Sequence, residues 1–156
     1  MSAFKKIIYW LVLSFFTVAS VLLILFYLVW NSSSAVDPAT LQYYATLKSE
    51  LRTRGFEDAV IIIGGKRSRV HNTILQAFGA SPTSTHLTGG ALDVLVMDVN
   101  GDGRMNDEDV DIVYGLLHEK IMRGKGGIGT YKNEWGFWNH QTIHFDSREA
   151  KARWNR

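Results

Sequence analysis

The 156-residue chain contains no cysteine. Its absence excludes a disulfide-stabilised scaffold, a cysteine-ligated zinc site and a lipid anchor on cysteine. Charge is also absent from residues 7–30. Two of the 17 lysines and arginines, Lys5 and Lys6, precede this run, and the other 15 balance the 15 aspartates and glutamates that follow it. Because the sequence after the run has no excess of positive charge, we do not expect it to bind nucleic acid.

The uncharged run at residues 7–30 predicts a single transmembrane helix. As an α-helix it would span roughly 36 Å, enough to cross a hydrocarbon core of about 30 Å. Because Lys5 and Lys6 lie on its N-terminal side, we expect residues 1–30 to form a single-pass anchor in the cell membrane with a cytoplasmic N-terminus. A cleaved signal peptide is the alternative, although its apolar core usually has only about 7–15 residues. Both interpretations place the rest of the chain outside the cytoplasm.

The sequence after the anchor divides into a short polar linker, residues 31–36, and one domain, residues 37–156. Apolar residues at helical spacing and short β-branched runs indicate its helices and strands. Because the two types are mixed without regular alternation, we expect an α+β fold. The predicted helices are 37–54, 70–78 and 110–121, and the predicted strands are 59–63, 91–97 and 142–145.

Two histidines and one aspartate in apolar surroundings form a candidate metal site. Asp93 interrupts the predicted strand 91–97, where a buried carboxylate needs a partner or a cation. His86 lies shortly upstream, and His144 lies in the predicted strand 142–145. Two imidazoles and one carboxylate can bind zinc and leave a fourth tetrahedral position open for water, whose pKa would fall to about 7. A hydrogen-bonded structural His–Asp pair is the alternative.

Five residues around this candidate site carry a family resemblance. Ser84, His86, Gly89, Ala91 and Asp93 match every fixed position of the S-x-H-x-x-G-x-A-x-D motif of the zinc D-Ala-D-Ala carboxypeptidase family. The chain resembles this family, which includes VanY-like carboxypeptidases and phage L-Ala-D-Glu endolysins and shares its fold with the Hedgehog signalling domain. Further similar segments are 66–72, 127–131 and 143–146, so that the resemblance covers roughly residues 38–148.

The resemblance implies a fold and an activity. The fold would be a Hedgehog-type or DD-peptidase-like zinc domain, with a small antiparallel sheet and flanking helices. The activity would be zinc-dependent hydrolysis of peptidoglycan peptides, by a carboxypeptidase or an endopeptidase. The implied zinc ligands are His86, Asp93 and His144. Arg67 would lie near the metal and bind a carbonyl or carboxylate of the substrate, unless it is an ordinary surface cation.

One position departs from the family pattern. Many members carry a glutamate or aspartate three residues before the last ligand as the general base, whereas this chain has Gln141, which cannot accept a proton. Asp146, His140 and Glu134 are candidates to replace it. Each also has a simpler interpretation: Asp146 could orient a metal ligand, His140 could be an ordinary loop residue, and Glu134 could be a solvated carboxylate. A catalytically inactive zinc- and calcium-binding module that binds peptidoglycan or a protein partner is therefore the alternative function.

Residues 98–109 follow the template of an EF-hand calcium loop. Six acidic side chains lie within residues 98–111 with one counter-charge, an arrangement that is repulsive without a cation. The pattern resembles the dockerin version of the loop, but it occurs once, so we do not expect cohesin binding. A solvated acidic turn is the alternative to structural Ca²⁺. The expected calcium ligands are Asp98, Asn100, Asp102, the carbonyl of Arg104, and Asp109.

Overall fold

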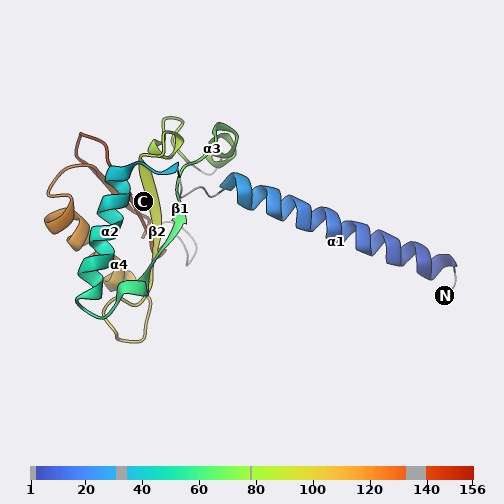
Figure 1. The fold of residues 1–156 in the computed structure, drawn as a ribbon, viewed down its shortest axis with the longest axis horizontal. Helices are drawn as coiled ribbons and strands as arrows, with labels where there is room; N and C mark the ends of the chain where they lie inside the picture. Colours follow the sequence, from blue (N-terminus) through green and yellow to red (C-terminus); the bar gives the residue numbers. More distant parts are fainter. Residues whose placement is uncertain (1–2, 31–34, 78, 133–139) are drawn as a thin grey trace.

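A computed structural model describes residues 3–30, 35–77, 79–132 and 140–156 of the chain. A long N-terminal helix, α1 (Ala3–Trp30), projects away from a globular domain (Figure 1). Its segment Phe4–Leu23 is long and apolar enough to cross a membrane, and none of that segment is buried against the domain. A signal sequence would satisfy the same criteria.

The domain is built on a five-stranded sheet in the order β1-β2-β4-β3-β5. All neighbouring strands are antiparallel except β3 and β5, which run parallel. The expected α+β class is confirmed, but the sheet is mixed rather than purely antiparallel. Neither β3 nor β5 was predicted, because β3 is half glycine and β5 has only four residues, two of them polar. The strands are β1 (Val60–Gly64), β2 (Ala91–Val96), β3 (Gly127–Thr130), β4 (Thr142–Asp146) and β5 (Ala152–Asn155).

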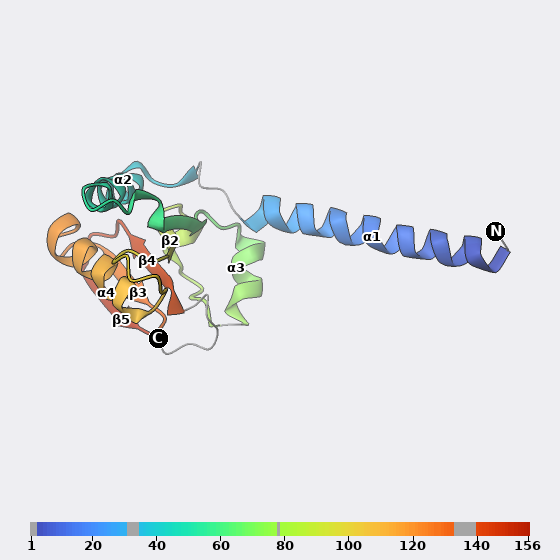
Figure 2. The ribbon, with the colours of Figure 1, turned by 90° about the horizontal axis from the view of Figure 1, so that it is seen from below.

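Two helices cover one face of this sheet. Helix α2 (Pro38–Arg52) and helix α4 (Asp107–Gly115), which continues as the π-helical turn η4 (Leu116–Ile121), lie on the side of the sheet away from α1 (Figures 1 and 2). Side chains from these helices and from the facing side of the strands form the apolar core. Its fully buried members include Leu47, Leu51, Leu92, Val94, Val110, Val113, Ile143 and Phe145.

Helix α2 begins where it was predicted, with Asp37 at the N-cap position and Pro38 as its first residue. Asp37 precedes α2 but makes no side-chain cap, and its carboxylate instead accepts a hydrogen bond from Ser147 Oγ at 2.6 Å. Helix α4 begins earlier than predicted because Asn106 caps it and Asp109 completes a capping box. Helix α3 (Arg69–Gln76), capped by Ser68, lies beside the sheet on the side nearest to α1 (Figure 2).

Candidate metal centre

One row of residues crosses all five strands and contains two of the predicted ligands. The register pairs Gly64 of β1 with Asp93 of β2, and Asp93 with His144 of β4. It continues from His144 to Gly129 of β3 and from Gly129 to Trp154 of β5. Because directly opposite residues project from the same face of a sheet, Asp93 and His144 share the face opposite the apolar core.

The two glycines in this row provide space for its functional side chains. A Cβ atom at Gly64 would lie 2.8 Å from Asp93 Oδ2, and a Cβ atom at Gly129 would overlap the indole of Trp154. Because Gly129 has no side chain, the Trp154 ring approaches the His144 ring to a centroid distance of 5.1 Å. Trp154 thus covers a glycine of the neighbouring strand, as aromatic residues in sheets often do.

His86 reaches the site from outside the sheet. It lies in the short 3-10 helix η3 (Thr85–Leu87), directly before β2, and its backbone N–H donates to Ser84 Oγ at 3.4 Å. Its ring is buried, with Nδ1 2.7 Å from the carbonyl oxygen of Gly65. A carbonyl oxygen can only accept, so Nδ1 carries the proton and Nε2 presents its lone pair to the site.

The His144 ring is oriented by a carboxylate on the opposite side. Its Nε2 lies 3.1 Å from Asp146 Oδ2, and Arg148 forms a bidentate pair with the same carboxylate, at 2.5 and 2.7 Å. Burial of Asp146 raises its pKa, but the hydrogen bonds from His144 and Arg148 outweigh burial and hold the pKa below the usual range. Asp146 is therefore ionised and accepts a hydrogen bond from the Nε2–H group, which leaves the His144 Nδ1 lone pair directed at the site.

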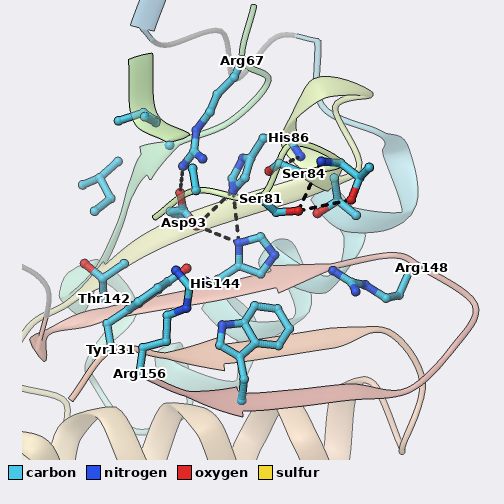
Figure 3. Close-up of a pocket in the computed structure, with 17 residues that line it drawn as sticks. Arg67, Ser81, Ser84, His86, Asp93, Tyr131, Thr142, His144, Arg148 and Arg156 are labelled. Atoms are coloured by element: carbon cyan, nitrogen blue, oxygen red, sulfur yellow. Dashed lines mark hydrogen bonds and ion pairs between the residues drawn. The ribbon is translucent and has the colours of Figure 1, made fainter. Parts of the chain in front are cut away.

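Three acceptor atoms therefore face one another (Figure 3). His86 Nε2 lies 3.1 Å from both Asp93 Oδ1 and His144 Nδ1, and His144 Nδ1 lies 2.9 Å from Asp93 Oδ1. Ligands of a tetrahedral zinc ion with bonds of 2.0–2.1 Å are separated by about 3.3 Å, so the triangle needs only slight expansion. Among the described residues, these three side chains are a group whose ligand atoms lie close enough together to bind one metal ion.

Three lone pairs this close repel one another unless a proton or a metal ion lies among them. The pKa directions without a metal reflect this requirement. Burial lowers the pKa of His144, but its hydrogen bonds to Asp146 and Asp93 outweigh burial and raise it. Burial raises the pKa of Asp93, but His86 and His144 outweigh it and hold the pKa well below the usual range. A shared proton or a metal ion satisfies the same three atoms.

The three residues lie at the wall of a cavity of about 750 Å³. Arg67 enters this cavity, with Nη2 2.5 Å from Asp93 Oδ2, so Asp93 can use one oxygen for a metal and the other for Arg67 (Figure 3). Arg148 and Arg156 also line it, whereas Asp93 is the one carboxylate among its described lining residues. With a divalent cation present the cavity would be strongly positive, which favours substrates that carry carboxylates.

The candidates for a general base are placed less favourably. Asp146 has no exposed surface and lies on the far side of the His144 ring, which favours the orienting role. His140 is half-buried and does not line the cavity, and neither does Gln141, which is 2% exposed. The Oε1 atom of Gln141 finds no hydrogen-bond partner within the described part of the chain. Glu134 lies outside the described residues.

The acidic loop 98–109 is held by its own hydrogen bonds. Asp98 accepts from the backbone N–H groups of Gly101 and Gly103 at 2.6 and 2.8 Å. The buried Asp109 accepts from those of Val99 and Asn106, both at 2.9 Å. The three predicted aspartate ligands do not form a second close group among the residues that the structure describes. Calcium binding by Asp98, Asn100, Asp102, Arg104 and Asp109 therefore stays a prediction.

Sequence reasoning missed the contribution of the C-terminal residues 148–156, which include β5, to the site. Arg148, Trp154 and Arg156 line the cavity, and the guanidinium of Arg148 lies 5.6 Å from the centre of the Trp154 ring. The one available signal was the alternation in residues 152–155, where Ala152 and Trp154 point to one face of the sheet. Four residues without a flanking turn are too short for such a prediction.

No protein-family model and no curated protein matches this chain. Among solved structures, the L-Ala D-Glu endopeptidase ChiX of Serratia marcescens is similar, with a TM-score of 0.46 and 22% sequence identity. The match covers 74% of this chain and 82% of that protein. This similarity is too low to assign the fold family or the activity of the chain.

Proposed function

We propose that this chain is a membrane-anchored zinc peptidase that hydrolyses peptidoglycan peptides outside the cytoplasm. One observation carries the proposal. The outer nitrogens of His86 and His144 are held by Gly65 and Asp146, so that both inner nitrogens and Asp93 Oδ1 present lone pairs to one point. Two imidazoles and one carboxylate suit zinc and leave a coordination position for chemistry. The choice of substrate rests on the motif shared with the zinc D-Ala-D-Ala carboxypeptidase family.

In such a reaction, different residues of the chain would hold the metal ligands in place and bind the substrate. A bound zinc ion would polarise the scissile carbonyl and make water acidic enough to act as the nucleophile near neutral pH. Asp146 fixes the ring orientation and tautomer of His144, and Arg67 fixes the orientation of Asp93. The guanidinium groups of Arg148 and Arg156 at the cavity wall would attract the carboxylates of a peptidoglycan peptide.

A catalytically inactive binding module is the second candidate function. The observation that favours it is the position of Gln141, which has no carboxylate and does not line the cavity. No carboxylate other than Asp93 lines the cavity among the described residues, and Glu134 stays a candidate base. Such a module would use the same metal and the same arginines to bind a peptide without cleaving it.

We further propose that Ca²⁺ binds the loop 98–109 in a structural role. Six acidic side chains in residues 98–111 support a cation by charge, and the loop starts five residues after Asp93. An ordered loop would fix the end of β2, the strand that presents Asp93 to the metal centre. The hydrogen bonds of Asp98 to Gly101 and Gly103 leave the remaining lone pairs of its carboxylate for an ion.

The test uses the full-length chain purified in detergent. Metal analysis should find one zinc ion per chain, and His86→Ala, Asp93→Ala and His144→Ala should each remove most of it. His118→Ala is the matched control, because the His118 ring meets Tyr114 edge to face in the helical layer and does not line the cavity. The zinc-loaded chain should release new amino termini from synthetic peptides that contain the L-Ala-D-Glu or D-Ala-D-Ala bond.

The outcomes separate the two functions. Zinc-dependent cleavage that is lost in the three ligand variants and kept in the control supports the peptidase. Zinc-dependent binding of the same peptides without new amino termini supports the binding module. Wild-type zinc content in all three ligand variants would overturn both functions.

A further inference from the structure

Helix α3 has its apolar residues on the outside. Val70 and Ile74 are 69% and 55% exposed, and they lie on the same side of the helix because they are four residues apart. The neighbouring polar residues His71 and Asn72 are buried against the domain. A surface helix normally shows the reverse distribution. The outward face of α3 is therefore suited to an apolar partner.

The surface around this face is basic. Residues 59–92 contain no aspartate or glutamate, whereas Lys66, Arg67 and Arg69 lie directly before α3 or in its first turn. Arg67 is paired with Asp93 inside the site. Lys66 and Arg69 are exposed, and neither takes part in an ion pair with another described residue. The partner of this face should therefore be apolar and negatively charged.

The chain itself places α3 close to the end of α1. The domain begins to pack at Val36, which is buried, and the backbone N–H of Asp37 donates to the Gly89 carbonyl at 2.8 Å. Five residues lie between Trp30 and Val36, so the end of α1 and the start of the domain can be at most roughly 20 Å apart. Figures 1 and 2 both show α3 as the domain helix nearest to the end of α1.

We propose that the α3 face, made of Lys66, Arg69, Val70 and Ile74, docks on the anionic phospholipid surface of the membrane that holds α1. Val70 and Ile74 would enter the interfacial layer, and the two cations would contact lipid phosphates. The proposal rests on α1 being a membrane span. Because Leu75 on the inner side of α3 lines the cavity, docking fixes the metal centre close to the membrane. The substrate would then be peptide near the membrane surface rather than in distant cell wall.

The absence of cysteine allows a direct test with the full-length chain. Ile74→Cys is labelled with an environment-sensitive fluorophore, and the chain is reconstituted into vesicles of phosphatidylethanolamine and phosphatidylglycerol. The matched control is Ala45→Cys, an exposed position on α2 across the sheet from α3. We expect blue-shifted emission and strong quenching by lipids with a spin label near the headgroup at position 74, and neither effect at position 45. Vesicle flotation measures insertion of α1 separately.

Each result is decisive for docking. Reversal of charge in Lys66→Glu with Arg69→Glu should reduce the quenching at position 74 in anionic vesicles, and equal quenching would overturn the role of anionic lipid. A chain that floats with vesicles but has a water-exposed label at position 74 overturns docking and leaves the peptidase proposal intact. A blue shift without lipid quenching indicates a protein partner and also overturns docking. A chain that does not float with vesicles would contradict both the membrane anchor and docking. The peptidase activity would still be tested by zinc-dependent cleavage in detergent.

Discussion

The Nε2 atom of His144 lies 3.1 Å from Oδ2 of Asp146, a carboxylate with no exposed surface. This contact decides which nitrogen of His144 faces the cavity. Because Asp146 is ionised and accepts a hydrogen bond from the Nε2–H group, Nδ1 presents its lone pair to Asp93 and His86. The residue two positions after the last candidate ligand therefore controls the chemistry of that ligand without reaching the metal position itself.

The first prediction concerns Asp146→Asn. Asp146 Oδ1 accepts from the backbone N–H of Gly127 at 3.0 Å and from Arg148 Nε, whereas Oδ2 faces His144 Nε2. The new amide can keep its oxygen towards Gly127 and Arg148 but would then turn an N–H group towards His144 Nε2. That change favours the tautomer with a proton on Nδ1, which removes the lone pair from the site. We expect zinc affinity to fall by about 10- to 100-fold, measured by competition with a chromogenic chelator. An unchanged affinity in a folded variant would show that Asp146 does not orient the ring.

The second prediction concerns calcium. If the loop 98–109 binds Ca²⁺ only in the folded state, calcium at one hundred times its Kd adds about 2.7 kcal/mol to the free energy of unfolding. For a domain of this size the melting temperature should rise by several degrees. Asp98→Ala with Asp102→Ala should abolish the rise. Asp109→Ala is unsuitable, since Asp109 also caps α4. Identical melting curves with and without calcium, at fixed zinc, would contradict calcium binding and show that the loop is an ordinary acidic turn.

The third prediction concerns the topology of the chain. An uncleaved anchor with Lys5 and Lys6 on its cytoplasmic side should leave an intact N-terminus on membrane-bound protein. A protease added to intact cells from outside should remove a C-terminal tag but not an N-terminal one. Mass spectrometry of the mature protein is the second measurement. A mature chain that begins near Val36 would contradict the anchor, although it would still agree with export.

The fourth prediction concerns pH and the packing of α2. The Tyr44 hydroxyl donates to the Val60 carbonyl at 3.1 Å. Burial raises the pKa of Tyr44, Lys48 opposes this effect, and Asp58 adds to it. Because the folded pKa lies above the unfolded one, this contribution to stability is complete below about pH 10 and is lost as pH rises through the folded pKa.

The measurement compares wild-type chain with Tyr44→Phe in detergent. We expect the variant to unfold more easily by about 1 kcal/mol near neutral pH, because it lacks the hydrogen bond. The difference should shrink as pH rises from about 10 through the raised folded pKa, because the phenol loses its proton first in the unfolded chain and then in the folded one. Other tyrosines and lysines titrate in both proteins, so the comparison isolates Tyr44. A difference that stays constant with pH would show that the pKa of Tyr44 is not raised.

The sequence was most informative where local chemistry sets the structure. The apolar run containing Asp93 predicted β2, and the short run of residues 142–145 predicted β4. His86, Asp93 and His144 were a candidate metal site from their residue types, and the family resemblance implied them as the zinc ligands. The structure brings their ligand atoms together. The identity of the ion and the role of Arg67 in substrate binding stay predictions.

Long-range pairing was not predictable in the same way. The parallel pairing of β5 with β3 depends on contacts between segments with no local strand signal, since Gly127 and Gly129 have low strand propensity. The approach of Trp154 to His144 depends on register across three strands, and a shift of one residue would turn the indole to the other face. A sequence pattern does not contain this register.

The last prediction tests that register through Gly129 and Trp154. A methyl group at Gly129 would overlap the indole, so Gly129→Ala should destabilise the domain by about 1–3 kcal/mol, the usual range for overpacking. Trp154→Ala removes the indole that the methyl group would overlap, and it also lowers the stability of the domain by itself. If the two side chains meet as the register implies, Gly129→Ala should cost much less in the Trp154→Ala background, a non-additivity that a double-mutant cycle measures. Because β5 also holds the indole against His144, Gly129→Ala alone should weaken zinc binding. Additive effects on stability would place Trp154 elsewhere and remove β5 from the metal centre.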